Sequence, residues 1–282
     1  MRVALRTDTC GNDIDRLCEY ASKLGIQDIW AFPEVKDLYS EKGRMRLKSL
    51  LQYQTRFMEG GLNLRILTER IDENVLLSTM KYKAKALSHT INVMGKAGID
   101  TLFLFVSVAH SEEKNTDEKM WKRLVKIYQE IVPCAEDAGV FIASHGHQTP
   151  RFMIRNYEGL NRLLKAVPSD HNGVTFCMGC HQLAGDDIYE TIQRFGKKIF
   201  FVHARDVMWK PNGFDEVAFD QGEVDVLKAL EELQKINYQG LVCPEHLPRI
   251  SYEPYRGIIG TSWGIGYLVS ALKCLEIKDK KA

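Results

Sequence analysis

Short apolar runs alternate with amphipathic stretches along this chain. The runs are rich in β-branched and aromatic residues, which favour strands, and the longer stretches repeat apolar residues at the helical period. In one stretch Leu124, Ile127, Tyr128 and Ile131 fall on one face of a helix. Several stretches end at a glycine just before the next run, as at Gly98. That order is typical of a helix, a tight turn and a strand.

The pattern predicts eight strands and eight helices in strict alternation. The expected strands are Val3–Thr7, Gln27–Phe32, Leu62–Leu67, Thr101–Val106, Val140–His145, Val174–Cys177, Ile199–His203 and Leu241–Glu245. The expected helices are Asp13–Leu24, Leu47–Gly60, Val75–Gly98, Asp117–Gly139, Asn156–Val167, Asp186–Gly196, Val224–Asn237 and Ser262–Ile277. This alternation predicts a parallel sheet with helices outside, and eight strands close a barrel.

An α/β fold consisting of a single (β/α)8 TIM barrel is therefore expected, as one domain over residues 1–282. An open doubly wound sheet is the alternative. It is disfavoured because no Gly-x-Gly-x-x-Gly motif follows the first expected strand. No linker, low-complexity stretch or change of composition divides the chain. In such barrels the active site lies at the C-terminal ends of the strands.

Four successive expected strands end at a residue that can bind a metal. These residues are His145, Cys177, His203 and Glu245. Imidazole, thiolate and carboxylate groups all bind divalent first-row metals. A single residue of this kind at a strand end usually has a structural role, but four on neighbouring strands predict a catalytic metal held from one side.

The sequence Cys177-Met-Gly-Cys180 has the C-x-x-C spacing of redox and zinc motifs. The motif is weak by itself, because a zinc ribbon would need a second pair nearby. We therefore interpret Cys177 as a metal ligand and Cys180 as a bystander.

The segments after these strands contain further polar residues. His147 would place a second imidazole near the metal. Arg205 would face the same side as His203 if the strand continued that far. Its guanidinium suits a carboxylate or phosphate, although a structural ion pair is the alternative. His246 directly follows an expected ligand and is a candidate acid or base, with a surface histidine as the plainer interpretation.

Two loops are candidates for a cover over a small polar substrate. They span residues 208–223 and 108–117 and contain polar and aromatic side chains. Loops of this kind often act as lids. The alternative is that both are mobile surface loops.

Charge and composition narrow the function further. The chain has 38 Lys and Arg against 37 Asp and Glu, so no general attraction to nucleic acid or anionic lipid is expected. The first residues do not read as a secretion signal, and no membrane-spanning window is apparent. Seven cysteines scattered through such a chain indicate reduced thiols and a cytoplasmic protein.

In and around the four expected metal ligands, the sequence resembles the mannonate dehydratase family, within the xylose isomerase-like group of TIM barrels. The resemblance is clearest over residues 91–100, 173–179, 195–207, 222–225 and 238–246. Members of the family bind a divalent metal, typically Mn²⁺, through His, Cys, His and Asp. The matching residues here are His145, Cys177, His203 and Glu245. Fe²⁺, Co²⁺ or Zn²⁺ could also bind. The resemblance implies dehydration of D-mannonate to 2-keto-3-deoxy-D-gluconate, with His246 as the catalytic histidine and Arg205 as the family arginine.

The chain also departs from the family pattern. Glu245 stands where the family has Asp, and the segment after the fifth strand reads His-Gly-His-Gln-Thr-Pro rather than His-Pro-Asp-Asp-Pro. Alignment on Gly260 places Arg256 where the family has a catalytic tyrosine, with Tyr255 one residue earlier. The chain is a short member. We therefore expect His246 and either Tyr255 or His147 to transfer protons, and Arg205 and Arg256 to contact substrate.

The leading hypothesis is a metal-dependent lyase that acts on a sugar acid. The principal alternative is a metal-dependent sugar isomerase or epimerase, which shares the proton abstraction but not the loss of hydroxide. A non-catalytic sugar-acid binding protein is a third candidate. A metal nuclease is disfavoured by the near-neutral charge. A small sugar acid or sugar is the expected partner, with no nucleic acid and no membrane, and a homo-oligomer is compatible with the sequence.

Overall fold

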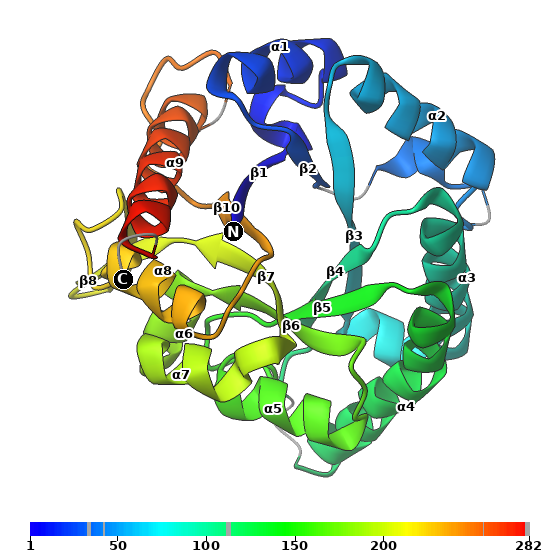
Figure 1. Cartoon of the computed structure of the whole chain (residues 1–282). Coiled ribbons are helices and arrows are strands. Elements are labelled where there is room, and N and C mark those ends of the chain that lie inside the picture. Colours follow the sequence, from blue (N-terminus) through cyan, green and yellow to red (C-terminus); the bar gives the residue numbers. More distant parts are fainter. Residues whose placement is uncertain (33–34, 42, 111–113, 256, 280–282) are drawn as a thin grey trace.

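The computed structural model describes residues 1–32, 35–41, 43–110, 114–255 and 257–279, and it contains a closed barrel of eight parallel strands (Figure 1). Around the barrel the order is β1, β10, β7, β6, β5, β4, β3 and β2, which confirms the expected fold. The strands are β1 Arg2–Arg6, β2 Asp28–Ala31, β3 Asn63–Asp72, β4 Thr101–Ser107, β5 Phe141–His145, β6 Asn172–Cys177, β7 Ile199–Ala204 and β10 Leu241–Pro244.

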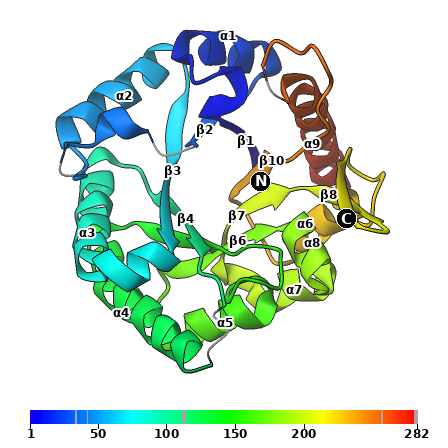
Figure 2. The ribbon, with the colours of Figure 1, turned by 180° about the vertical axis from the view of Figure 1, so that it is seen from behind.

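Helices form an outer ring around these strands (Figures 1 and 2). They are α1 Ile14–Leu24, α2 Leu47–Glu59, α3 Met80–Ala97, α4 Lys114–Ala138, α5 Tyr157–Ala166, α7 Ile188–Phe195, α8 Val226–Lys235 and α9 Ile258–Asp279. A short helix α6, Met178–Ala184, follows β6 and was not expected from the sequence. Aspartates cap several of the helices: Asp13, Asp187 and Asp225 each accept a hydrogen bond from a backbone N–H in the first turn, which satisfies a donor that the helix itself cannot.

The interior of the barrel is filled by a compact apolar cluster. Its buried members are Ala4, Trp30, Ile66, Phe103, Ala143, Phe201, Leu241 and Cys243. Alternate residues of a strand point to the same face, so the residue two positions later in each strand lies just beyond this cluster. His145, His203 and Glu245 follow Ala143, Phe201 and Cys243 in this way. The packing of the barrel therefore places these side chains together at its C-terminal end.

The segment expected as an irregular lid over residues 208–223 instead begins with a β-hairpin. Strand β8, Asp206–Lys210, pairs antiparallel with β9, Gly213–Val217. The buried carboxylate of Asp206 accepts hydrogen bonds from four backbone N–H groups, those of Val207, Gln221, Gly222 and Val224. These bonds tie the segment that follows the hairpin to its base. The second expected lid, residues 108–117, lies partly outside the described residues.

One of the described helices, α9, is long and apolar enough over Ile258–Ile277 to cross a membrane, judged by length and composition. No such window was expected from the sequence, so that expectation is corrected. Core helices of soluble proteins pass the same test, but they are mostly buried, whereas 28% of this window is buried. Here α9 contacts β1 and β10 as the last helix of the barrel, and Ile265 and Leu268 on it are buried.

Candidate active site

The four expected metal ligands lie at the C-terminal ends of neighbouring strands. His145 ends β5, Cys177 ends β6, His203 lies one residue before the end of β7, and Glu245 directly follows β10. His203 is in register with Cys177 on one side and with Cys243 on the other. All four side chains are buried. The parallel register therefore brings together residues that are far apart in the sequence.

The donor atoms form two overlapping groups that share Cys177. One group consists of His145, Cys177 and Cys180, and the other of Cys177, His203 and Glu245. Within each group the donor atoms lie within 4.8 Å of one another. Among the described residues no group of all four expected ligands forms at that spacing. The structure thus brings Cys180, which the sequence analysis set aside, beside His145.

The residues present fit a divalent metal. Nδ1 of His145 and both ring nitrogens of His203 are buried and have no hydrogen-bond partner. Nδ1 of His203 lies 3.1 Å from Oε2 of Glu245, but without hydrogen-bond geometry. A buried polar atom without a partner destabilises a protein by about 1–3 kcal/mol. Ligation of a metal would explain why the fold keeps these nitrogens unpaired, and His, Cys and Glu are the donor types that first-row ions bind.

The local charges also suit a cation. Burial alone would raise the pKa of the Cys177 thiol, but the neighbouring polar groups of Cys180, His145 and His203 hold that pKa well below its usual value. Burial would likewise raise the pKa of Glu245, and the neighbouring His203 and His246 hold it well below its usual range. A thiolate and a carboxylate therefore meet at the barrel mouth. Two anions in a buried place favour a bound divalent ion.

His246 lies beside the last ligand in an unusual backbone conformation. Its φ is +55°, in the left-handed region that non-glycine residues seldom adopt. Its Nδ1 is 2.6 Å from Oε1 of Glu216, and its Nε2 is 3.4 Å from Oε1 of Glu245. Burial would lower its pKa, but the charge of Glu245 and the contact with Glu216 raise it to about 9. The ring is thus held between two carboxylates.

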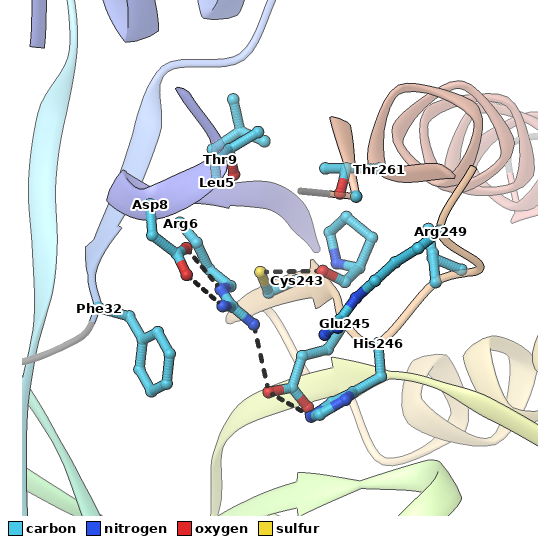
Figure 3. A pocket seen from close by; sticks show the side chains of 13 residues that line it. Leu5, Arg6, Asp8, Thr9, Phe32, Cys243, Glu245, His246, Arg249 and Thr261 are labelled. Atoms are coloured by element: carbon cyan, nitrogen blue, oxygen red, sulfur yellow. Dashed lines mark hydrogen bonds and ion pairs between the residues drawn. The ribbon is translucent and has the colours of Figure 1, made fainter. Parts of the chain in front are cut away.

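A cavity of about 210 Å³ opens beside Glu245 and His246, between the end of β1 and the segment after β10 (Figure 3). Arg6 lines it and pairs with Asp8, with Nε 2.9 Å from Oδ1. Nη1 of Arg6 lies 3.6 Å from Oε1 of Glu245. Sequence reasoning missed Arg6, although the strand period already placed it two residues beyond the inward-facing Ala4. The cavity therefore combines a cation, a candidate ligand and a candidate acid or base.

Arg205, which directly follows β7, is almost fully buried. Its Nη2 is 2.8 Å from Oε1 of Glu216, and its Nη1 donates to Sγ of Cys180 at 3.4 Å. It is not among the described residues that line the cavity of Arg6. The ion pair with Glu216 is the structural alternative that the sequence analysis had left open. Glu216 was missed as a site residue, although Pro211-Asn212-Gly213 is a turn sequence that favours a hairpin.

Two of the remaining expected site residues, His147 and Tyr255, make other contacts. The half-buried ring of His147 stacks on Phe152 with 4.1 Å between centroids. Tyr255 packs against the turn at Gly11, and the guanidinium of Arg16 lies 5.6 Å from its ring centroid. Neither His147 nor Tyr255 is among the described residues that line the cavity beside His246. Arg256 lies outside the described residues.

The model of the D-mannonate dehydratase (UxuA) family matches residues 84–282 of this chain. The chain belongs to this family. All four expected ligands, Arg205 and His246 fall within the matched region. Mannonate dehydratase of Thermotoga petrophila is 30% identical over 184 residues, which cover 60% of this chain and 51% of that protein. The chain thus spans about half the length of the curated relatives it matches.

Solved structures with the same fold cover most of the chain. Mannonate dehydratase from Streptococcus suis serotype 2 superposes with a TM-score of 0.81 at 20% identity, covering 96% of this chain and 93% of that one. The IolI protein with a bound zinc atom gives a TM-score of 0.72 at 21% identity, covering 96% and 98%. At these identities the likeness concerns the fold, and it supports the xylose isomerase-like barrel.

Proposed function

We propose that this protein is a metal-dependent hydro-lyase that removes water from a sugar acid such as D-mannonate and yields a 2-keto-3-deoxy acid. The observation that carries the proposal is the set of unpaired imidazole nitrogens, thiolate and carboxylate at the barrel mouth, with His246 beside them. Membership of the D-mannonate dehydratase family supports the reaction class. The same proposal places the enzyme in the cytoplasm, where its cysteines would stay reduced.

His145, Cys177, His203 and Glu245 would hold the metal. Mn²⁺ is the proposed ion, with Fe²⁺, Co²⁺ and Zn²⁺ as alternatives. A divalent ion at this place would draw charge from the oxygens of the substrate and so make the proton next to the carboxylate easier to remove. The burial of all four side chains keeps competing water away from their donor atoms.

His246 would carry out proton transfer. The reaction breaks the C–H bond next to the carboxylate and the C–O bond at the following carbon, and the resulting enol rearranges to the keto acid. One group must accept the proton and another must protonate the departing hydroxyl. His246 lines the cavity and can serve as one of them. Tyr255 and His147 are the candidates for the other.

Two arginines could receive the negative charge of the substrate. Arg205 lies beside Cys177 and Cys180, where its pKa is raised because the negative charge of Cys177 and of nearby carboxylates outweighs the effect of burial. Arg6 lines the cavity itself. We propose that the carboxylate lies on the metal or Arg205 and that Arg6 contacts the polar remainder of the substrate. Arg256, which matches the tyrosine position of the family, stays a candidate contact.

The test is turnover by metal-loaded protein on a panel of aldonic acids and neutral sugars. A 2-keto-3-deoxy acid is the expected product, and His246→Asn should lower kcat by a factor of about 10² to 10⁴ without loss of metal. A product of unchanged mass and altered stereochemistry would instead select an isomerase or epimerase. Saturable binding without turnover would select a sugar-acid binding protein.

Arg205→Lys separates the lyase from the isomerase alternative by a second route. Lys lacks the planar fork that holds a carboxylate through two hydrogen bonds. The substitution should therefore weaken binding of a sugar acid far more than binding of a neutral sugar. Equal effects on the two ligands would argue against recognition of an acid.

A further inference from the structure

We infer that Glu216 is a positioning residue that orients the imidazole of His246 for proton transfer. This inference rests on the proposed function of His246 and assigns a role to the β8–β9 hairpin. Oε1 of Glu216 lies 2.6 Å from Nδ1 of His246 and 2.8 Å from Nη2 of Arg205. One carboxylate oxygen thus joins the segments that follow β7 and β10.

The hairpin holds Glu216 in place. In the antiparallel register Glu216 stands opposite Val207, which is fully buried. Its neighbour Asp215 belongs to the opposite face and pairs with Lys210 at 3.5 Å, with 62% of its side chain exposed. The four hydrogen bonds accepted by Asp206 tie down the base of the hairpin. Glu216 therefore points toward the site from a rigid support, as a positioning residue requires.

The backbone of His246 gives a reason for such a support. A non-glycine residue at positive φ is strained, and it persists where its surroundings hold it. The hydrogen bond at Nδ1 supplies one such restraint on the side chain. It also places a proton on Nδ1 and leaves Nε2, on the side of Glu245, as the atom that exchanges a proton. Carboxylates that bond the far nitrogen of a functional histidine set its tautomer and orientation in this way.

The contact with Arg205 restrains the carboxylate from the other side. Arg205 is itself fixed by burial and by Sγ of Cys180. Glu216 therefore cannot turn away from His246 without giving up its ion pair with a buried guanidinium, which is unfavourable. A continuous series of contacts thus links the metal-binding donors to the proposed acid or base, and it runs through Cys180, Arg205, Glu216 and His246.

The test compares Glu216→Ala with Glu216→Gln in the metal-loaded protein. Glu216→Ala should lower kcat by about 10-fold to 100-fold and change KM by less than about 3-fold, with metal content unchanged. Glu216→Gln should recover part of the loss, because its amide oxygen can accept the same hydrogen bond. Asp215→Asn is the matched control, since it removes a carboxylate one residue away on the exposed face, and it should turn over like the wild type.

A spectroscopic measurement tests the contact without any substrate. Long-range ¹H–¹⁵N correlation spectra of the zinc-loaded protein, recorded above the His246 pKa of about 9 so that the ring is neutral, report which ring nitrogen of His246 carries the proton. We expect protonated Nδ1 in the wild type and in Glu216→Gln, and a shift toward protonated Nε2 in Glu216→Ala. The same Nδ1 signal in the wild type and Glu216→Ala would overturn the inference, as would wild-type kcat in Glu216→Ala. If the wild type turned over no sugar acid, the proposed function would fail while these spectra still decided the role of Glu216.

Discussion

The two halves of the barrel treat their buried polar groups differently. In the half formed by β1 to β4, the buried side chains of Trp30, Thr68 and Glu69 are paired, although Nε of Arg65 near the start of β3 has no hydrogen-bond partner. Nε1 of Trp30 donates to Thr68, whose hydroxyl donates to the backbone of Ala31. Glu69, which is 3% exposed, accepts from Lys83 at 2.5 Å and from Tyr39 at 2.8 Å.

In the half formed by β5, β6, β7 and β10, ring nitrogens of two buried histidines at the strand ends are not satisfied. His145 and His203 have three ring nitrogens without a hydrogen-bond partner between them. A third buried histidine of this half, His181, bonds Asp186 at 2.6 Å instead. The comparison teaches that burial of a polar group alone does not mark a functional site. The mark here is a cluster of buried metal-binding donors in which several atoms lack a partner, because stability selects against such a cluster unless a ligand compensates.

The largest effect is expected from His203→Ala. It removes the imidazole whose nitrogens are both unpaired, so the protein should lose most of its bound metal, and turnover should fall with it. Elemental analysis of the purified variant measures the metal. Retention of a full equivalent would show that the unpaired nitrogens of this half are not ligands.

Lys83→Met tests the paired half. It leaves the buried carboxylate of Glu69 without its cation and should lower the free energy of unfolding by about 3 kcal/mol, while metal content stays unchanged. Denaturant titration measures this change. Lys81→Met, at an exposed position of the same helix, is the control and should change stability by less than about 0.5 kcal/mol. Metal loss in Lys83→Met would show that the paired groups of the β1 to β4 half also contribute to metal binding.

Substitution of Cys177 and Cys180 tests which of the two cysteines binds the metal. Cys177 belongs to both donor groups and Cys180 to one, so Cys177→Ser should remove most of the metal. Cys180→Ser should weaken metal binding by no more than about 10-fold. Competition with a coloured chelator measures both affinities. Equal losses in the two variants would make Cys180 a ligand in its own right.

The smallest effect is expected from Asp186→Asn, which removes the partner of the satisfied histidine. Burial would raise the pKa of Asp186, but the hydrogen bond and charge of His181 outweigh it and lower the pKa. The unfolded state then binds more protons, so this carboxylate stabilises the fold above its unfolded pKa of about 3.8, and the contribution is lost as the pH falls through the lower folded pKa. Unfolding titrations from about pH 6 to about pH 3 should show the difference between wild type and variant shrinking. A difference that grew on acidification would contradict this pairing.

The strand and helix pattern was predictable because it is local. Apolar runs such as Thr101–Val106 follow from the period of side chains along one element, and the barrel follows from the number of alternating elements. The observed strands agree with the expected ones, and β3 alone runs well past its expected end, to Asp72. The location of the four proposed ligands at strand ends was predictable for the same reason, since each ends a recognisable run.

The pairing of side chains was not predictable from the sequence. The charges of Glu216 and Arg205 are visible in the sequence, but their contact depends on a hairpin that folds back over the end of β7. The role of Arg6 depends on the closure of the barrel, which brings β1 next to β10 and so places Arg6 beside Glu245.

The sequence by itself determined the barrel, the strand ends that carry His145, Cys177, His203 and Glu245, and the resemblance to a dehydratase family. Only the tertiary structure decided which of the polar groups are paired and which are left open. The physical reason is the sequence separation of the residues involved. Periodicity and strand ends arise from residues that are neighbours in the sequence. Whether a buried nitrogen finds a partner depends on groups brought together across the barrel from distant parts of the chain.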